Sequence, residues 1–157
     1  MKRAITISSL LPCLFVTSLF FGCSKSNNNN TTKSKTELLQ GSWHHTSVIY
    51  SPAMYDYNND GVKDAEAYPF TADCQKDDFM TLQTNGVAVF DEGTTKCNPS
   101  DPQTRNTTWS LSSDEKTLTV DGASVTLIQL DDNVLKVLTT GSDNGVSFTI
   151  TVTYQRK

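Results

Sequence analysis

From Trp43 onward, the sequence alternates between short segments rich in β-branched and aromatic residues and clusters of turn-forming residues. Short runs of this kind, bounded by turn signals at regular spacing, predict β-strands. No segment after residue 40 has a helical period, and only 36–40 reads as a short helical turn. Asn85-Gly86 and Asp121-Gly122 stand between such runs, which favours hairpins. The predicted strands are 43–50, 79–82, 87–90, 107–111, 117–120, 124–128, 134–138 and 146–154.

The strand pattern also predicts how the strands are arranged. Residues 117–120 and 148–152 alternate polar and apolar side chains, which places one face of each strand in a core and the other in water. Short links between successive strands impose antiparallel neighbours. Eight antiparallel strands that must lose their edges close naturally into a barrel. We therefore predict an all-β, eight-stranded up-and-down barrel in one domain, residues 37–157.

The N-terminal 22 residues are typical of a secretory signal peptide. Two basic residues precede an apolar run, 4–21, whose purely apolar stretches are too short to span a membrane. The run ends Leu19-Phe20-Phe21-Gly22-Cys23, which resembles a lipobox, with a small residue before the cysteine. We expect residues 1–22 to be removed and Cys23 to carry a lipid anchor. The alternative is a cleaved soluble protein in which Cys23 is incidental.

Residues 24–36 contain no apolar side chain, so we expect the segment 23–36 to be a disordered tether that starts at the lipidated cysteine. The domain after it carries eight Lys and Arg against 17 Asp and Glu, a net charge of −9. This charge disfavours nucleic acid and anionic lipid surfaces as partners. In some lipoproteins of this kind, acids just after the lipidated cysteine signal surface export. Residues 24–30 have none, so an outer-membrane lipoprotein on the periplasmic side is favoured over the cell surface.

The four cysteines are not equivalent. Cys13 lies in the predicted signal peptide and Cys23 is the predicted lipidation site, which leaves Cys74 and Cys97 in the exported domain. Disulfides persist in such compartments, so we predict that Cys74 and Cys97 are bonded. The alternative is a redox or metal pair. No CxxC motif occurs and no histidine lies close in sequence to either cysteine.

Several ordered motifs resemble a known family. Gly41-Ser42-Trp43 begins the first strand and Arg156 ends the last, as in the lipocalin signature. The segment 74–78 (Cys-Gln-Lys-Asp-Asp) precedes the Asn-Gly hairpin, and 91–97 (Asp-Glu-Gly-Thr-Thr-Lys-Cys) follows it. The strand segment 107–111 (Thr-Thr-Trp-Ser-Leu) comes next. Over residues 38–156 the domain resembles the lipocalin-like lipoproteins of Gram-negative bacteria.

The resemblance implies a fold and, by analogy, a function. It implies that the Trp43 indole closes the narrow barrel end next to Gly41, with the Arg156 cation above its face. Such a contact contributes roughly 0.5–2 kcal/mol. By analogy with lipocalins it also implies a small hydrophobic ligand. An eight-stranded barrel with short strands can equally be filled by its own side chains, so the resemblance leaves both interiors open.

The connection after the first predicted strand carries oxygen-bearing side chains at regular spacing. Its residues Asp56, Asn58, Asp60 and Asp64 fall at positions 1, 3, 5 and 9 of an EF-hand-like loop, with Gly61 at 6 and the Val62 carbonyl at 7. Ca²⁺ prefers six to eight such oxygens. Position 12 is Ala67, so Glu66 or water would fill the gap. We predict a weak structural calcium site; the alternative is a solvated acidic turn.

Other candidate chemistry is sparse. His44 and His45 are adjacent on a strand and point to opposite faces, so they cannot chelate one metal together. Asp77-Asp78, Asp91-Glu92 and Asp131-Asp132 read as solvated turn or edge charges. No nucleophile elbow, phosphate loop or zinc motif occurs.

Three functions follow from this pattern. A non-enzymatic, monomeric binding module for a small apolar ligand would contain a continuous apolar cavity. A structural or protein-interaction lipoprotein would have a filled barrel and an exposed apolar patch. An enzyme would require convergent acids and a histidine in one pocket.

Overall fold

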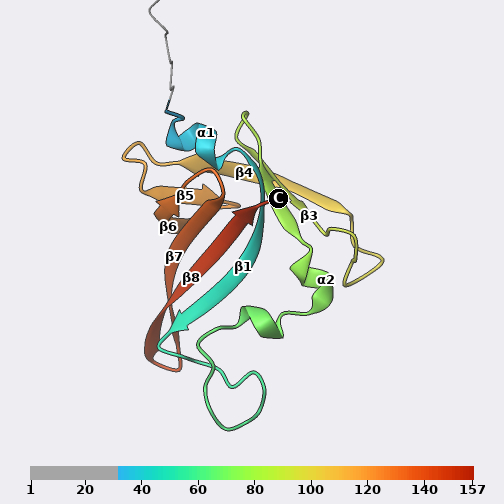
Figure 1. Ribbon diagram of the computed structural model, residues 1–157, viewed down its shortest axis with the longest axis vertical. Helices are drawn as coiled ribbons and strands as arrows, with labels where there is room; N and C mark the ends of the chain where they lie inside the picture. Colours follow the sequence, from blue (N-terminus) through green and yellow to red (C-terminus); the bar gives the residue numbers. More distant parts are fainter. Residues whose placement is uncertain (1–31) are drawn as a thin grey trace, which may run out of the picture. The chain divides into compact units, whose positions relative to one another are not determined.

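Eight antiparallel strands form a closed barrel in which each strand pairs with its neighbours in the chain and β8 pairs with β1 (Figure 1). This computed structural model describes residues 32–157; the predicted signal peptide 1–22, Cys23 and the tether up to residue 31 lie outside the described residues. The predicted up-and-down barrel is confirmed. Its strands are β1 (Gly41–Ser51), β2 (Phe79–Leu82), β3 (Val87–Asp91), β4 (Thr104–Leu111), β5 (Thr117–Val120), β6 (Ala123–Leu130), β7 (Val134–Asp143) and β8 (Val146–Arg156).

The short helix α1 (Lys35–Leu39) precedes β1 at one end of the barrel (Figure 1). Ser34 caps it: the Ser34 hydroxyl accepts from the Glu37 N–H at 3.2 Å, and the Glu37 carboxylate accepts from the Ser34 N–H at 2.7 Å. This reciprocal capping satisfies two backbone donors of the first turn. The boundary predicted for the tether, residue 36, therefore lies inside the helix.

The barrel is uneven, and this unevenness creates an opening. β1 pairs with β8 along almost its whole length but with β2 only over Gly41–Trp43. Beyond Trp43, the connection from β1 to β2 returns beside β1, where the Ala67 N–H donates to the Val48 carbonyl at 2.8 Å. It includes the 3-10 turn η1 (Tyr68–Phe70) and the short helix α2 (Asp73–Lys76). Figure 1 shows the long strands β1, β7 and β8 extending past the shorter ones.

The hairpins follow the predicted turn signals, with one difference. Asp121-Gly122 and Asn144-Gly145 both place two residues at positive φ, with values of 53° and 77° and of 49° and 79°. This backbone matches the twist of the flanking strands. At the predicted Asn85-Gly86 turn only Gly86 has a positive φ, 78°. The turn there is closed by the Gly86 N–H, which donates to the Gln83 carbonyl at 3.2 Å.

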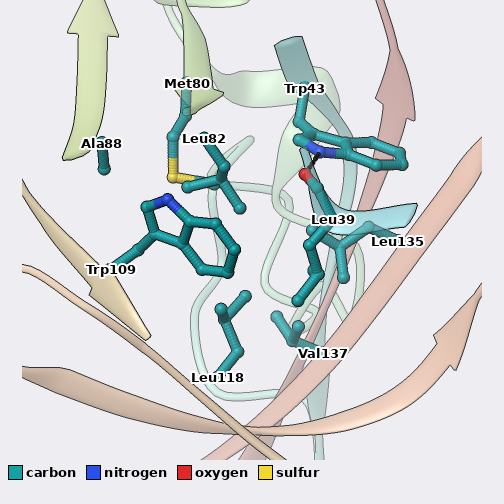
Figure 2. Packing of buried hydrophobic residues seen from close by; sticks show 9 residues of the cluster. All are labelled: Leu39, Trp43, Met80, Leu82, Ala88, Trp109, Leu118, Leu135 and Val137. Atoms are coloured by element: carbon teal, nitrogen blue, oxygen red, sulfur yellow. Dashed lines mark hydrogen bonds between the residues drawn. The ribbon is translucent and has the colours of Figure 1, made fainter. Parts of the chain in front are cut away.

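The core lies at the end of the barrel that α1 covers (Figure 2). Trp43 and Leu39 are fully buried there. The Trp109 indole packs beside Leu82, and its N–H donates to the Gln83 carbonyl at 2.8 Å. A buried indole N–H needs such a partner. Residues 32–157 form one compact unit, with core members Leu39, Trp43, Met80, Leu82, Ala88, Trp109, Leu118, Leu135 and Val137.

Candidate functional site

One end of the barrel is closed by the residues that the lipocalin resemblance implicated. The Arg156 guanidinium carbon lies 4.2 Å from the Trp43 ring centroid. The same guanidinium donates to the carbonyls of Leu38 at 2.6 Å, Gln40 at 2.7 Å and Asp132 at 2.5 Å. Carbonyls at a helix C-terminus have no intrahelical partner. Arg156 therefore supplies hydrogen-bond donors to the carbonyls at the end of α1 and at the same time covers the Trp43 indole.

Gly41 allows the guanidinium to come this close. Its φ is +120°, and a Cβ at this position would collide with the Arg156 Nη1. Residues other than glycine rarely adopt such a backbone conformation. The structure thus brings Gly41, Trp43 and Arg156 together as one closure. The Trp43 indole N–H joins this closure to α1, because it donates to the Leu39 carbonyl at 2.7 Å.

Beyond this closure, the barrel interior contains an apolar cavity of about 180 Å³. Almost every lining side chain is aliphatic or aromatic, because the inward positions of β5 to β8 are occupied by Leu, Val and Ile. The Tyr154 side chain lines the cavity, and burial raises the pKa of its hydroxyl. The interior is therefore not completely filled by the barrel's own side chains.

A second, larger pocket of about 470 Å³ opens at the gap between β1 and the short strands. It shares Met80, Phe90 and Tyr154 with the inner cavity, so these three side chains form a common wall between the two spaces. We call this larger space the mouth pocket. Its remaining lining comes from β1, from the start of β2 and the residue before it, from the end of β3, from the β3–β4 connection and from β4: Trp43, His45, Asp78, Phe79, Asp91, Glu92, Asp101, Pro102, Gln103 and Arg105.

Four carboxylates line the mouth pocket, and Asp78 is the most perturbed of them. One of its oxygens, Oδ1, is buried with no hydrogen-bond partner. Burial, and then the nearby charges of Glu92, Asp77 and Asp91, raise the pKa of the Asp78 carboxyl above its ordinary value. Both effects disfavour the charged form. The sequence predicted a solvated turn charge; in the structure Asp78 is only partly exposed and lines the mouth pocket.

The basic and imidazole groups of the mouth pocket have their own partners. The Arg105 guanidinium pairs with the Asp121 carboxylate at 2.8 Å and lies 4.7 Å above the Phe90 ring. The His45 ring makes an edge contact with Tyr68, with centroids 5.2 Å apart. Burial, and to a lesser degree the neighbouring His44, lower the pKa of His45, so its imidazole is neutral at neutral pH.

The rim of the mouth pocket is held by a covalent and a polar link. Cys74 in α2 and Cys97 in the β3–β4 connection form a disulfide with a Cα–Cα distance of 5.1 Å, which confirms the predicted pair. Beside it, the Asp77 carboxylate accepts from the Thr94 N–H at 2.7 Å, the Thr94 hydroxyl at 2.5 Å and the Thr95 N–H at 3.0 Å. Both links join the segment before β2 to the segment after β3.

The predicted calcium loop is folded by its own side chains. The Asp56 carboxylate accepts from the N–H groups of Asp60, at 3.1 Å, and Gly61, at 2.8 Å. The Asn58 Oδ1 accepts from the Asp60 N–H at 3.0 Å. Asp60 itself accepts from the Val62 N–H at 2.8 Å. Three of the predicted ligands therefore turn into the loop.

The other two predicted side-chain ligands of the calcium loop have different partners. Asp64 accepts from the Tyr57 N–H at 2.9 Å. Glu66 faces β1, where it accepts from the Ser47 hydroxyl and the Val48 N–H, each at 2.7 Å. Within residues 32–157, no group of three or more His, Cys, Asp or Glu side chains is arranged to hold a metal ion. The calcium site stays a prediction from spacing.

Sequence reasoning missed most of the mouth pocket. Asp78, Asp91 and Glu92 were read as solvated charges, and Asp101 and Arg105 carried no motif. The available signal was indirect: the predicted disulfide ties the segment before β2 to the one after β3 and so places their acids near each other. The side chains of His44 and His45 lie in different environments, as the predicted strand implied. His45 lines the mouth pocket, while the Nδ1 atom of His44 is buried without a partner.

Comparison with known proteins identifies the family. The family model of the lipocalin-like domain matches residues 39–137. The chain belongs to the lipocalin-like domain family. The lipocalin-like match covers the barrel from the Trp43 closure to the middle of β7, including both cysteines of the rim. No curated protein matches the sequence.

Among solved structures, the lipocalin-like chain is similar to two forms of bovine odorant-binding protein. The first is a deswapped triple mutant, with 12% identity, a TM-score of 0.39, and coverage of 76% of this chain and 74% of that one. The second is a complex with a selenium-containing odorant, with 12% identity, a TM-score of 0.38, and coverage of 80% and 74%. Separately, the helices in residues 32–157 are all too short or too polar to cross a membrane.

Proposed function

We propose that this protein is a membrane-anchored, lipocalin-like binding module that takes a small apolar ligand into its barrel and carries out no catalysis. The anchor would be a lipid on Cys23, with the barrel on the periplasmic face of the outer membrane. The protein would act as a monomer, because the eight strands pair in a closed ring and no whole strand is left as a free edge for a second copy.

The observation that carries this proposal is the pair of adjoining cavities. The inner cavity of about 180 Å³ is lined mostly by aliphatic and aromatic side chains. The mouth pocket of about 470 Å³ shares three of these lining residues with it. Ligand pockets typically span roughly 300–1,000 Å³ and are mostly apolar with a few polar groups. An open interior of this kind favours a ligand-binding barrel over the filled-barrel alternative.

The mouth pocket also contains the acids and the histidine that an enzyme would require. Their arrangement gives them little catalytic capacity. Among the described residues, no hydrogen bond joins His45 to a carboxylate, and its ring faces the Tyr68 ring instead. A general base needs its partner within hydrogen-bond reach. We therefore favour binding over catalysis.

Titration with the neutral fluorescent probe N-phenyl-1-naphthylamine tests the proposal. Saturable enhancement with one site per protein is expected. Val152→Phe fills the inner cavity and should weaken binding by about tenfold or more, since a blocked cavity forfeits the apolar contact area. Ile128→Phe is the matched control, because Ile128 is 47% exposed. Equal binding by both variants, or no saturable binding at all, would contradict a ligand inside the barrel.

A further inference from the structure

The mouth pocket combines an apolar wall with an excess of negative charge. Met80, Phe90 and Tyr154 form the wall that it shares with the inner cavity. Asp78 enters from the segment before β2, Asp91 from the end of β3, and Glu92 and Asp101 from the β3–β4 connection. Acids on a surface turn need no explanation, but these acids face a cavity that the proposed function assigns to a ligand.

Among the described residues, the basic groups near the pocket make no ion pair with these acids; the Lys96 ammonium donates to the Asp101 backbone carbonyl and not to its carboxylate. Arg105, the basic side chain in the lining, is paired with Asp121 outside the pocket's acids. The Lys157 ammonium lies 3.5 Å from the centroid of Phe79, on the ring rather than on a carboxylate. His45, on β1, is neutral at neutral pH because burial lowers its pKa.

Among the four acids, Asp78 is the one whose carboxylate has a buried oxygen, Oδ1, with no hydrogen-bond partner. Asp91, in contrast, already accepts from the Gly93 N–H at 3.0 Å and from the Gln103 amide at 2.8 Å. A desolvated carboxylate oxygen with no donor is costly, and like charges nearby add to that cost. A cation placed beside Asp78 would relieve both.

We propose that the mouth pocket selects ligands that combine an apolar body with one cationic amine. The apolar body lies against Met80, Phe90 and Tyr154, the wall that the mouth pocket shares with the inner cavity, and the ammonium group lies at Asp78 with Glu92 nearby. This inference rests on the proposed function: if the barrel binds a small apolar ligand, the inference states which charge that ligand carries.

Calorimetry with three ligands of equal chain length tests the charge. Octylammonium, 1-octanol and octanoate are titrated at neutral pH and low salt into residues 24–157, which include the complete compact unit 32–157. Octylammonium should bind at least about tenfold more tightly than octanoate, the size expected of a partly desolvated charge pair. Octanol should fall between them.

Variants locate the charge recognition. Asp78→Asn should weaken octylammonium binding by about tenfold and leave octanol binding unchanged. Asp143→Asn removes an equal charge at the β7–β8 turn, away from the mouth pocket, and should change neither. If Asp78→Asn does not fold, Glu92→Gln provides the second test, with a smaller loss of octylammonium affinity.

The outcomes separate this inference from the proposed function. Octanoate binding as tightly as octylammonium would overturn the charge selection while leaving an apolar site in place. Failure of all three ligands to bind would overturn the proposed function and this inference with it. Displacement of octylammonium by equimolar Ca²⁺ would mark the acids as a metal site and would also overturn the inference.

Discussion

At the scale of single residues, Arg156 joins several segments at the closed end of the barrel. It contacts the Trp43 ring and donates to three backbone carbonyls at once. A lysine cannot reproduce this, because its ammonium lacks the planar fork of donors. The barrel closure therefore depends on the guanidinium group of Arg156 and not only on its positive charge.

Arg156→Ala is expected to lower the free energy of unfolding by about 2–4 kcal/mol, because it removes charge-assisted hydrogen bonds and a cation–aromatic contact. Arg156→Lys should recover only part of this. Arg105→Ala is the matched control: that arginine also stacks on a phenylalanine but makes an exposed ion pair, so a loss below about 1 kcal/mol is expected. Urea denaturation measures all three, and equal losses at 105 and 156 would contradict the assigned role.

Asp77 makes the rim sensitive to acid. Hydrogen bonds from Thr94 and Thr95 hold the pKa of its carboxyl below the ordinary value. A carboxyl with a lower pKa in the folded state stabilises the fold above its unfolded-state pKa, and this contribution is lost as pH falls through the folded-state pKa. The thermal midpoint of Asp77→Ala should therefore lie below that of the unmutated protein at neutral pH.

The same midpoints should converge in acid, once the pH has fallen below the folded-state pKa of Asp77, because the carboxyl is then protonated in both states. Asp73→Ala is the control. The Asp73 pKa is also lowered, through its pair with Lys76, but its side chain is 96% exposed, and such pairs contribute little. A midpoint difference for Asp77→Ala that is the same at both pH values would show that the carboxylate's charge is not what matters.

At the scale of elements, the disulfide connects the two segments that frame the mouth pocket. It closes a loop with a sequence separation of 23, for which chain entropy predicts roughly 3 kcal/mol of stabilisation. The double variant Cys74→Ser/Cys97→Ser should lose about this amount in chemical unfolding.

The loss should be local as well as global. Amide exchange in the double variant should increase in 72–78 and 92–103, and remain slow in β7 and β8, whose ten-residue pairing does not involve the rim. A uniform increase across the barrel would indicate that the disulfide stabilises the whole fold rather than the rim. Reduction of the unmutated protein should reproduce the variant.

The loop 56–66 provides a second test at this scale. If Asp56, Asn58 and Asp60 bind Ca²⁺, calorimetry should give a weak Kd on the order of 10⁻⁴–10⁻³ M. Asp60→Ala should abolish the heat, whereas Glu66→Gln should leave it, because Glu66 is engaged by Ser47 and Val48. No heat and no gain in thermal midpoint for the unmutated protein at millimolar Ca²⁺ would leave only an acidic turn.

At the scale of the whole molecule, the proposed anchor depends on Cys23. The precursor should partition into membranes and incorporate labelled fatty acid. Cys23→Ser should appear in the soluble fraction, because it removes the side chain that would carry the lipid. Membrane association of Cys23→Ser after detergent-free fractionation would count against the lipoprotein assignment, while Cys13→Ser should behave as the unmutated protein does.

The sequence by itself determined the number and order of the strands. The alternation of polar and apolar side chains in 117–120 and turn pairs such as Asp121-Gly122 are local signals, so they can be read without knowledge of the fold. It also determined the pair Cys74 and Cys97, because no other cysteine remains in the domain. The start of α1 was placed late, since Ser34 and Glu37 cap the helix within a stretch that has no apolar residue.

The tertiary structure alone decided what surrounds the acids. Asp78 and Asp131 both belong to Asp pairs near a strand end. Asp131 caps an exposed turn through the Asn133 and Val134 N–H groups, at 2.9 and 2.8 Å, whereas Asp78 faces a cavity. The difference arises because β1 leaves β2 after Trp43 and the disulfide draws the β3–β4 connection across the gap. Burial of a charge depends on such contacts between distant segments, which no local pattern encodes.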